Sequence, residues 1–169
     1  PFVAIGLLYR QGYFNQKINK EGWQETTYTE LDHTELPIKP VHTKNNEELV
    51  INIDFPGRTV FAKVWQVNIG RNKLYMLDTN VDSNSQYDRD ITARLYGGDQ
   101  EMRIQQEIFL GIGGLKVLNA LGINPTIYHM NEGHSSFVCI ELIKNLVVEK
   151  QMSFKDAREI VSSATIFTT

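Results

Sequence analysis

The first half of the chain alternates hydrophobic and polar positions with the period of two that is typical of half-buried β-strands. Four alternate positions of a strand over 48–55 are apolar: Leu49, Ile51, Ile53 and Phe55. A Pro-Gly turn leads into a β-branched and aromatic run over 59–69, and a Gly-Arg-Asn turn leads into a third strand over 73–77. These strands predict an antiparallel β-meander. Residues 9–45 are polar and aromatic, which predicts loops with short strands.

The second half changes to helical periodicity. After a short helix over 88–95, Asp99 is the predicted N-cap of a helix that runs to Leu121, because its carboxylate can accept free amides of the first turn. The apolar residues of this helix, Ile104 among them, fall on two stripes, so we expect it to be buried. Glycines at 111, 113 and 114 each weaken a helix by roughly 1 kcal/mol relative to Ala. They predict the close approach of another backbone.

The last part of the chain has the order strand, helix, helix, strand. A short buried strand over 125–130 precedes a helix to Glu149 capped by Ser135 or Ser136, and Ser153 begins a second helix before a strand over 164–168. Two strands joined by helices pair in parallel, and loops at the carboxyl ends of such strands carry ligands. We therefore expect one α/β domain piece over residues 1–169, with 131–134 as the place to look for a site.

Composition excludes several classes of protein and function. The chain has 169 residues, 41% hydrophobic and 22% charged, which excludes a disordered, collagenous or disulfide-built chain. Its net charge of −3 argues against a nucleic-acid or anionic-membrane partner. A single cysteine, Cys139, is expected to be a buried thiol in a protein of the reducing cytoplasm. An apolar start at 2–8 and a β-type end at 164–169 indicate a fragment of a longer protein.

Two titratable groups in the 131–134 loop are the candidate chemistry. His129, Glu132 and His134 do not follow the H-E-x-x-H spacing of zinc enzymes, so no metal site is expected and His129 is interpreted as a core histidine. Glu132 and His134 could bind sugar hydroxyls, or the loop could be a solvated turn; spacing leaves both open. Arg103 and Glu107 have the i, i+4 spacing of a surface ion pair. The polar and aromatic cluster at 9–16 could line a cleft.

Several strings of residues, taken in order, resemble one family. They are YRQGYFNQKI at 9–18, GWQ at 22–24, RLYGGD at 94–99, RIQQE at 103–107, HMNEGH at 129–134 and IFTT at 166–169. This set closely resembles the α-glucan phosphorylases, the glycogen and maltodextrin phosphorylase family, and most of all its shorter bacterial and archaeal members. The resemblance covers nearly the whole chain and is weakest at about 30–60.

The resemblance implies an interior segment of the Rossmann-like N-terminal domain of a two-domain glycosyltransferase of the GT-B type. Members of the family cleave α-1,4-glucans such as glycogen, starch or maltodextrin with inorganic phosphate and release glucose 1-phosphate. They use pyridoxal phosphate, bound by a lysine of the C-terminal domain, which this chain lacks. The implied partners are an α-glucan or maltooligosaccharide and phosphate, with a homo-oligomer of the parent protein. The isolated segment is expected to be inactive.

The resemblance also implies roles for individual residues. Asp99 matches the acidic residue of a gating loop, which is shorter here than in the longer enzymes. Glu132 and His134 match residues that face the glucan acceptor subsites, and Asn131 matches a neighbour that orients the turn. Arg103 matches an arginine near the gating loop. No catalytic, cofactor-binding or metal-binding residue is assigned within the chain.

Two other functions stay open at this point. One is a sugar-nucleotide-dependent glucosyltransferase of similar architecture, which phosphate dependence would separate from a phosphorylase. The other is a non-catalytic glucan-binding module, which requires tight maltodextrin binding by residues 1–169.

Overall fold

The predicted meander forms most of a five-stranded mixed sheet. In this computed structural model, which describes residues 2–32, 35–95 and 97–169, β5 (Val50–Phe55), β6 (Arg58–Ile69) and β7 (Asn72–Asp78) pair antiparallel as predicted. Two strands join them: β1 (Val3–Leu7), parallel to β7, and the short β4 (Lys39–Pro40), antiparallel to β6. The α/β fold class is therefore confirmed.

The apolar faces of these strands bury one core. Leu49, Ile51 and Ile53 are buried on the predicted face of β5, together with Val60, Ala62 and Val64 of β6. The strand β1 has no alternation because it lies between two cores: Val3 and Ile5 pack against both hydrophobic clusters of the molecule. A strand covered on both sides is uniformly apolar, so its sequence lacks the period of two.

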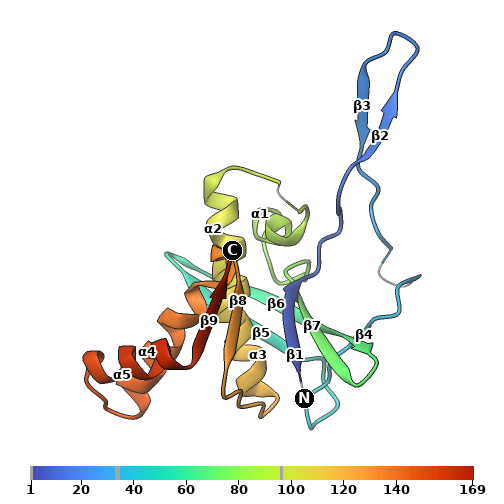
Figure 1. The fold of residues 1–169 in the computed structure, drawn as a ribbon. Coiled ribbons are helices and arrows are strands. Elements are labelled where there is room, and N and C mark those ends of the chain that lie inside the picture. The colour runs from blue at the N-terminus through green and yellow to red at the C-terminus, as the bar shows by residue number, and fades with distance from the viewer. Residues whose placement is uncertain (1, 33–34, 96) are drawn as a thin grey trace.

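A β-hairpin projects from the rest of the molecule. It consists of β2 (Asn15–Ile18) and β3 (Gln24–Thr27), which pair antiparallel and expose every residue (Figure 1). With β4, it confirms the prediction of short strands within 9–45.

The predicted long helix is present but has three parts. It comprises α2 (Gln100–Ile108), a π-helical turn (Phe109–Gly113) and α3 (Gly114–Ala120), and it covers one face of the sheet. The Asp99 carboxylate accepts a hydrogen bond of 2.9 Å from the amide of Met102, which confirms the predicted N-cap. Gly122 ends the helix with φ of +68°.

One of the three glycines of this helix lies where another backbone approaches closely, as predicted: a Cβ at Gly111 would lie 2.6 Å from the amide nitrogen of Val138. At Gly114 the close neighbour is a side chain, with Cγ2 of Ile5 at 2.8 Å, and at Gly113 the nearest atom, Cδ1 of Ile53, is at 3.4 Å, so the prediction is wrong for these two.

The predicted stripes are buried in large part: Leu115 and Val117 are buried, and Ile108, Ile112 and Leu121 pack against the core. Ile104 departs from the prediction at 47% exposed, whereas Gln105 and Gln106 are buried. Gln105 donates from Nε2 to the hydroxyl of Tyr87 at 3.0 Å, and the partners of Gln106 are described below; burial of polar groups requires such partners.

The last part of the chain forms a separate parallel pair. It runs through β8 (Tyr128–Asn131), a 3-10 turn (Gly133–Ser135), α4 (Phe137–Glu149), α5 (Phe154–Ser163) and β9 (Thr165–Thr168). Strands β8 and β9 pair in parallel as predicted. Ser153 accepts a hydrogen bond of 3.2 Å from the amide of Asp156, which confirms that cap.

Two predictions for this part are wrong. Neither Ser135 nor Ser136 caps α4 with its side chain, because the preceding 3-10 turn runs directly into the helix with Ser136 already in a helical conformation. His129 is exposed rather than in the core, because β8 has only one buried side chain, that of Met130. The His129 ring nitrogen Nε2 lies 3.0 Å from the hydroxyl of Thr168 on β9.

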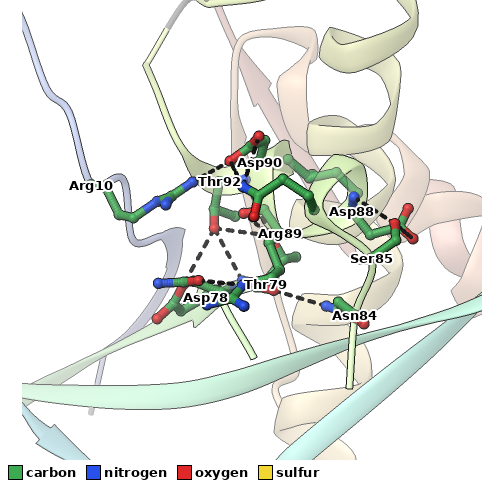
Figure 2. Close-up of polar contacts among 12 residues, drawn as sticks. Arg10, Asp78, Thr79, Asn84, Ser85, Asp88, Arg89, Asp90 and Thr92 are labelled. Atoms are coloured by element: carbon green, nitrogen blue, oxygen red, sulfur yellow. Dashed lines mark hydrogen bonds and ion pairs between the residues drawn. The ribbon is translucent and has the colours of Figure 1, made fainter. Parts of the chain in front are cut away.

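The segment after β7 is held by buried polar contacts. It includes the short helix α1 (Gln86–Arg89) and a 3-10 turn (Asp90–Thr92), which begin two residues earlier and end three residues earlier than predicted. Thr79 and Thr92 exchange amide-to-hydroxyl hydrogen bonds of 3.0 and 3.2 Å (Figure 2). The Asn84 amide group donates 2.8 Å hydrogen bonds to the carbonyls of Phe61 and Thr79. These bonds fix the start of the loop that leads to α2.

Candidate functional site

The loop after β8 has a strained backbone at Glu132. This residue has φ of +57° and ψ of −168°, close to a region that is otherwise almost confined to glycine. Its amide donates a 2.7 Å hydrogen bond to the carbonyl of Thr168, so the end of β9 holds the loop in place. Backbone strain of this kind costs about 1–3 kcal/mol and is found most often at functional sites. The observed strain therefore marks 131–134 as a candidate site.

His134 lies between two carboxylates in this loop. Its Nε2 is 3.2 Å from Oε2 of Glu132, and its Nδ1 is 3.3 Å from Oε1 of Glu107 on α2. The Glu107 side chain is the less exposed of the two carboxylates, 30% against 58% for Glu132. The loop is thus tied to the helix that crosses the sheet.

A pocket of about 220 Å³ opens beside His134. Its lining combines apolar and polar residues. The apolar lining is Ile5, Leu7, Leu95 and Leu110, with Gly6; the polar lining is Tyr9, Arg103, Gln106, Glu107 and His134. Apolar side chains combined with polar groups that fix orientation are typical of small-molecule sites.

Backbone pairing and one buried side chain bring the pocket walls together. The amide of Gln11 donates to the carbonyl of Ala93 at 2.8 Å, and the amide of Leu95 donates to the carbonyl of Gln11 at 3.0 Å. Gln106 donates from Nε2 to the carbonyls of Ile91 at 2.7 Å and Arg94 at 3.3 Å. The helix α2 is therefore fastened to the segment that carries Leu95.

The structure brings some of the predicted site residues together and separates others. His134 and Arg103 line the pocket, and Glu132 contacts His134. Asp99 is exposed, caps α2 and is not part of the lining, and Asn131 is an exposed residue at the end of β8. Of the cluster at 9–16 that was expected to line a cleft, Tyr9 lines the pocket and residues 10–16 do not.

Glu107 and Gln106 are the pocket residues that sequence reasoning missed. The i, i+4 spacing of Arg103 and Glu107 places both residues on one side of α2. This spacing was the feature of the sequence that could have placed Glu107 in the pocket beside Arg103. The predicted ion pair between them is wrong, because Glu107 contacts His134 instead.

Other ionisable groups near the loop point to structural roles. Burial raises the pKa of Tyr128 on β8. Burial also raises the pKa of the Cys139 thiol, while a hydrogen bond with Thr165 opposes that shift. The thiol is half-buried rather than buried as predicted, and it lies 3.6 Å from the sulfur of Met130. Neither group lines the pocket.

Two kinds of feature are absent from the part of the chain that the structure describes. Within residues 2–32, 35–95 and 97–169, no three His, Cys, Asp or Glu side chains are grouped as a metal site would require. Over the same ranges, none of the helices combines the length and the apolar character needed to span a membrane.

Comparison with known proteins settles which family the chain resembles. Along its entire length it is 45% identical to maltodextrin phosphorylase from Thermococcus litoralis, 40% identical to glycogen phosphorylase from Mycobacterium tuberculosis, and 37% identical to glycogen phosphorylase from Aquifex aeolicus. The resemblance to the α-glucan phosphorylases is confirmed. The chain spans 20%, 20% and 24% of the lengths of these three phosphorylases.

No family model matches the chain. Among solved structures, the catalytic domain of starch synthase IV from Arabidopsis thaliana, bound to ADP and acarbose, aligns with 77% of the chain and 22% of its own length. The TM-score is 0.47 and the sequence identity is 14%. The similarity to the phosphorylases is thus the stronger of the two.

Proposed function

We propose that the chain is part of an α-1,4-glucan phosphorylase and that its pocket belongs to the glucan cleft. The parent enzyme would cleave glycogen, starch or maltodextrin with inorganic phosphate and release glucose 1-phosphate. One observation carries the proposal. Four of the strings that resemble the family, from three separate regions of the sequence, each supply lining residues to the same pocket: Tyr9, Leu95, the pair Arg103 and Glu107, and His134.

The chemistry of the pocket suits a sugar. Carboxylate, imidazole and guanidinium groups can exchange hydrogen bonds with hydroxyls, while the apolar lining residues can accommodate the carbon faces of a ring. We assign substrate contacts to Glu132 and His134, with Arg103 as a further contact. Asn131 would orient the turn, and Asp99 would act from the N-terminus of α2, outside the pocket.

Pyridoxal phosphate does not fit the residues present here. Its attachment requires a lysine, and the lining of this pocket contains none. We therefore place the cofactor in another part of the parent protein and assign no step to it through this chain. The residues of this chain would bind and orient glucan.

Three further expectations belong to the same proposal. We propose that residues 1–169 are part of one Rossmann-like domain of a GT-B enzyme, that the parent enzyme forms a homo-oligomer, and that it works in the cytoplasm. On its own, the segment should carry out no phosphorolysis, because it lacks the cofactor lysine.

The experiment measures glucose 1-phosphate formed from maltodextrin and phosphate by the full-length protein loaded with pyridoxal phosphate. A hydrogen bond to a charged group is worth about 1.5–3 kcal/mol, so losing it in His134→Ala should lower turnover by at least tenfold. The same substitution should change the melting temperature little. His129→Ala is the matched control, because His129 is an exposed histidine on the adjoining strand. It should leave turnover unchanged.

Other outcomes would contradict the proposal in different ways. Glucosyl transfer from a sugar nucleotide without phosphate dependence would indicate the glucosyltransferase instead. Tight maltodextrin binding by residues 1–169 with no turnover in the full-length protein would indicate a binding module. Equal kinetics for His134→Ala and His129→Ala would indicate that the 131–134 loop has a structural role and does not bind substrate.

A further inference from the structure

The contacts of His134 give its two ring nitrogens different partners. Nδ1 faces Glu107, which comes from α2, and Nε2 faces Glu132 in the same loop. The charged and titratable groups around this ring are these two carboxylates, with Arg103 on α2 and Tyr9 beyond β1 in the same pocket. The ring therefore connects the strained loop with the helix.

The contacts of the ring restrict where its protons lie, because Nδ1 and Glu107 meet in a hydrogen bond, whereas Nε2 and Glu132 are at ion-pair distance. An ionised carboxylate can only accept a hydrogen bond, so contact with Glu107 requires a proton on Nδ1. In the neutral ring, Nε2 then carries a lone pair, and no hydrogen bond to an ionised Glu132 can form there. The partner of one ring nitrogen fixes the state of the other, as it does in histidines that bind metals.

We propose that Glu107 is a positioning residue that holds the neutral imidazole of His134 in the Nδ1–H form. The bare Nε2 is then the hydrogen-bond acceptor offered beside Glu132, and a hydroxyl group of the ligand can donate to it. That the ligand is a glucan rests on the proposed function, whereas the protonation of the ring rests on its contacts and on the burial of the two carboxylates.

The different burial of the two carboxylates explains why the neutral ring donates its hydrogen bond to Glu107 rather than to Glu132. Both could accept from the ring, but Glu107 is half as exposed, 30% against 58%. Water competes less for a carboxylate that is more buried, so its hydrogen bond is the stronger one. Glu107 also extends from a helix, whereas Glu132 lies in a loop. Removing the charge of Glu107 should therefore transfer the proton to the side that faces Glu132.

The test is nitrogen-15 NMR of the His134 ring in the 169-residue chain without ligand, at a pH where the ring is neutral. The native chain should show mainly the Nδ1–H form. Glu107→Gln should shift the ratio toward Nε2–H by roughly tenfold or more, as expected for a hydrogen bond to a charged acceptor. Glu132→Gln should leave the Nδ1–H form dominant, and Glu159→Gln, an exposed residue of α5, should change nothing.

The proposal is overturned if the native ring is mainly Nε2–H, or if Glu107→Gln and Glu159→Gln give the same ratio. A merely structural tie between helix and loop predicts the second of these results, because glutamine keeps the length of the side chain. If Glu107→Gln does not fold, the tautomer ratios of the native chain and of Glu132→Gln still decide whether the proposal holds.

A second measurement separates this inference from the proposed function. In the full-length protein, Glu107→Gln should reduce turnover, and it should cause no further loss once His134 is replaced by Ala. Losses that simply multiply in the double variant would contradict a role that acts through His134. The expected ring tautomer without any glucan phosphorolysis would leave the positioning role standing and refute the proposed function.

Discussion

Gly111 lies where the π-helical turn meets the first turn of α4, and Gly111→Ala tests how closely these backbones approach. The added Cβ would lie 2.6 Å from the amide nitrogen of Val138 and 2.8 Å from Cβ of Phe137. Gly113, two residues further along, provides the control. A Cβ there would meet only side-chain atoms, the nearest being Cδ1 of Ile53 at 3.4 Å.

The two substitutions should have opposite signs. In a helix, alanine is favoured over glycine by roughly 1 kcal/mol. At Gly113 this gain should remain, so the free energy of unfolding should rise by about 0.5–1 kcal/mol. At Gly111 the obstacle is backbone, which yields less than the end of a side chain. Overpacking of about 3 kcal/mol, less the same gain, leaves a loss of about 2 kcal/mol.

Urea unfolding of the 169-residue chain measures this difference. With a slope of about 2 kcal/mol per molar urea, the midpoints of the two variants should differ by more than about 1 M, with Gly111→Ala the lower. Unchanged slopes would show that both variants unfold from the same compact state. If Gly111→Ala is as stable as the native chain, the close packing of the π-helical turn against α4 is refuted.

Two further results follow from buried groups. Gln106→Met should lower the free energy of unfolding by about 1–3 kcal/mol, because the carbonyl of Ile91 loses its hydrogen-bond partner. The control, Ile104→Gln on the exposed side of α2, should change the free energy of unfolding by less than about 0.5 kcal/mol. Equal effects of the two substitutions would contradict the packing of α2. The raised pKa values of Cys139 and Tyr128 mean that the unfolded chain releases these protons first, at the ordinary values of 9.0 and 10.0. Stability should therefore fall as the pH rises above about 9. The fall should be smaller in Cys139→Ala, and a stability that rises above pH 9 would refute the assigned direction.

Local patterns were sufficient to predict most of the elements. The alternation in β5 and the caps at Asp99 and Ser153 depend on neighbouring residues, and the structure confirms each of them. The apolar run of β1 was not assigned to a strand, since its partner β7 lies about seventy positions away and both of its sides are covered. Pairing over such distances leaves no periodic signal.

The candidate site was predicted in part for a similar reason. Glu132 and His134 are two residues apart in the sequence, and a turn with such residues is readily found. Glu107 is 27 residues from His134, and its nearest sequence partner, Arg103, suggested a surface ion pair. Gln106 was missed because a glutamine in a helix is ordinarily exposed. Its burial depends on the carbonyls of 91 and 94, which only the fold brings within reach.

The helix that carries Arg103 and Glu107 makes the site sensitive to chain length outside its π-helical turn. The π-helical turn accommodates one residue more than an α-helical turn, so deleting one residue from 109–113 would convert it to an α-helical turn and leave both side chains on the same side of the helix. Each residue of an α-helix advances the chain by about 100° around the axis, so deleting one residue from 114–116 would rotate Arg103 and Glu107 away from the 131–134 loop while Val117 kept its place on the sheet. The projecting hairpin of β2 and β3 could gain or lose residues at its tip without moving any wall of the pocket (Figure 1). Insertions and deletions should therefore be tolerated in the hairpin and excluded from the α-helical parts of this helix.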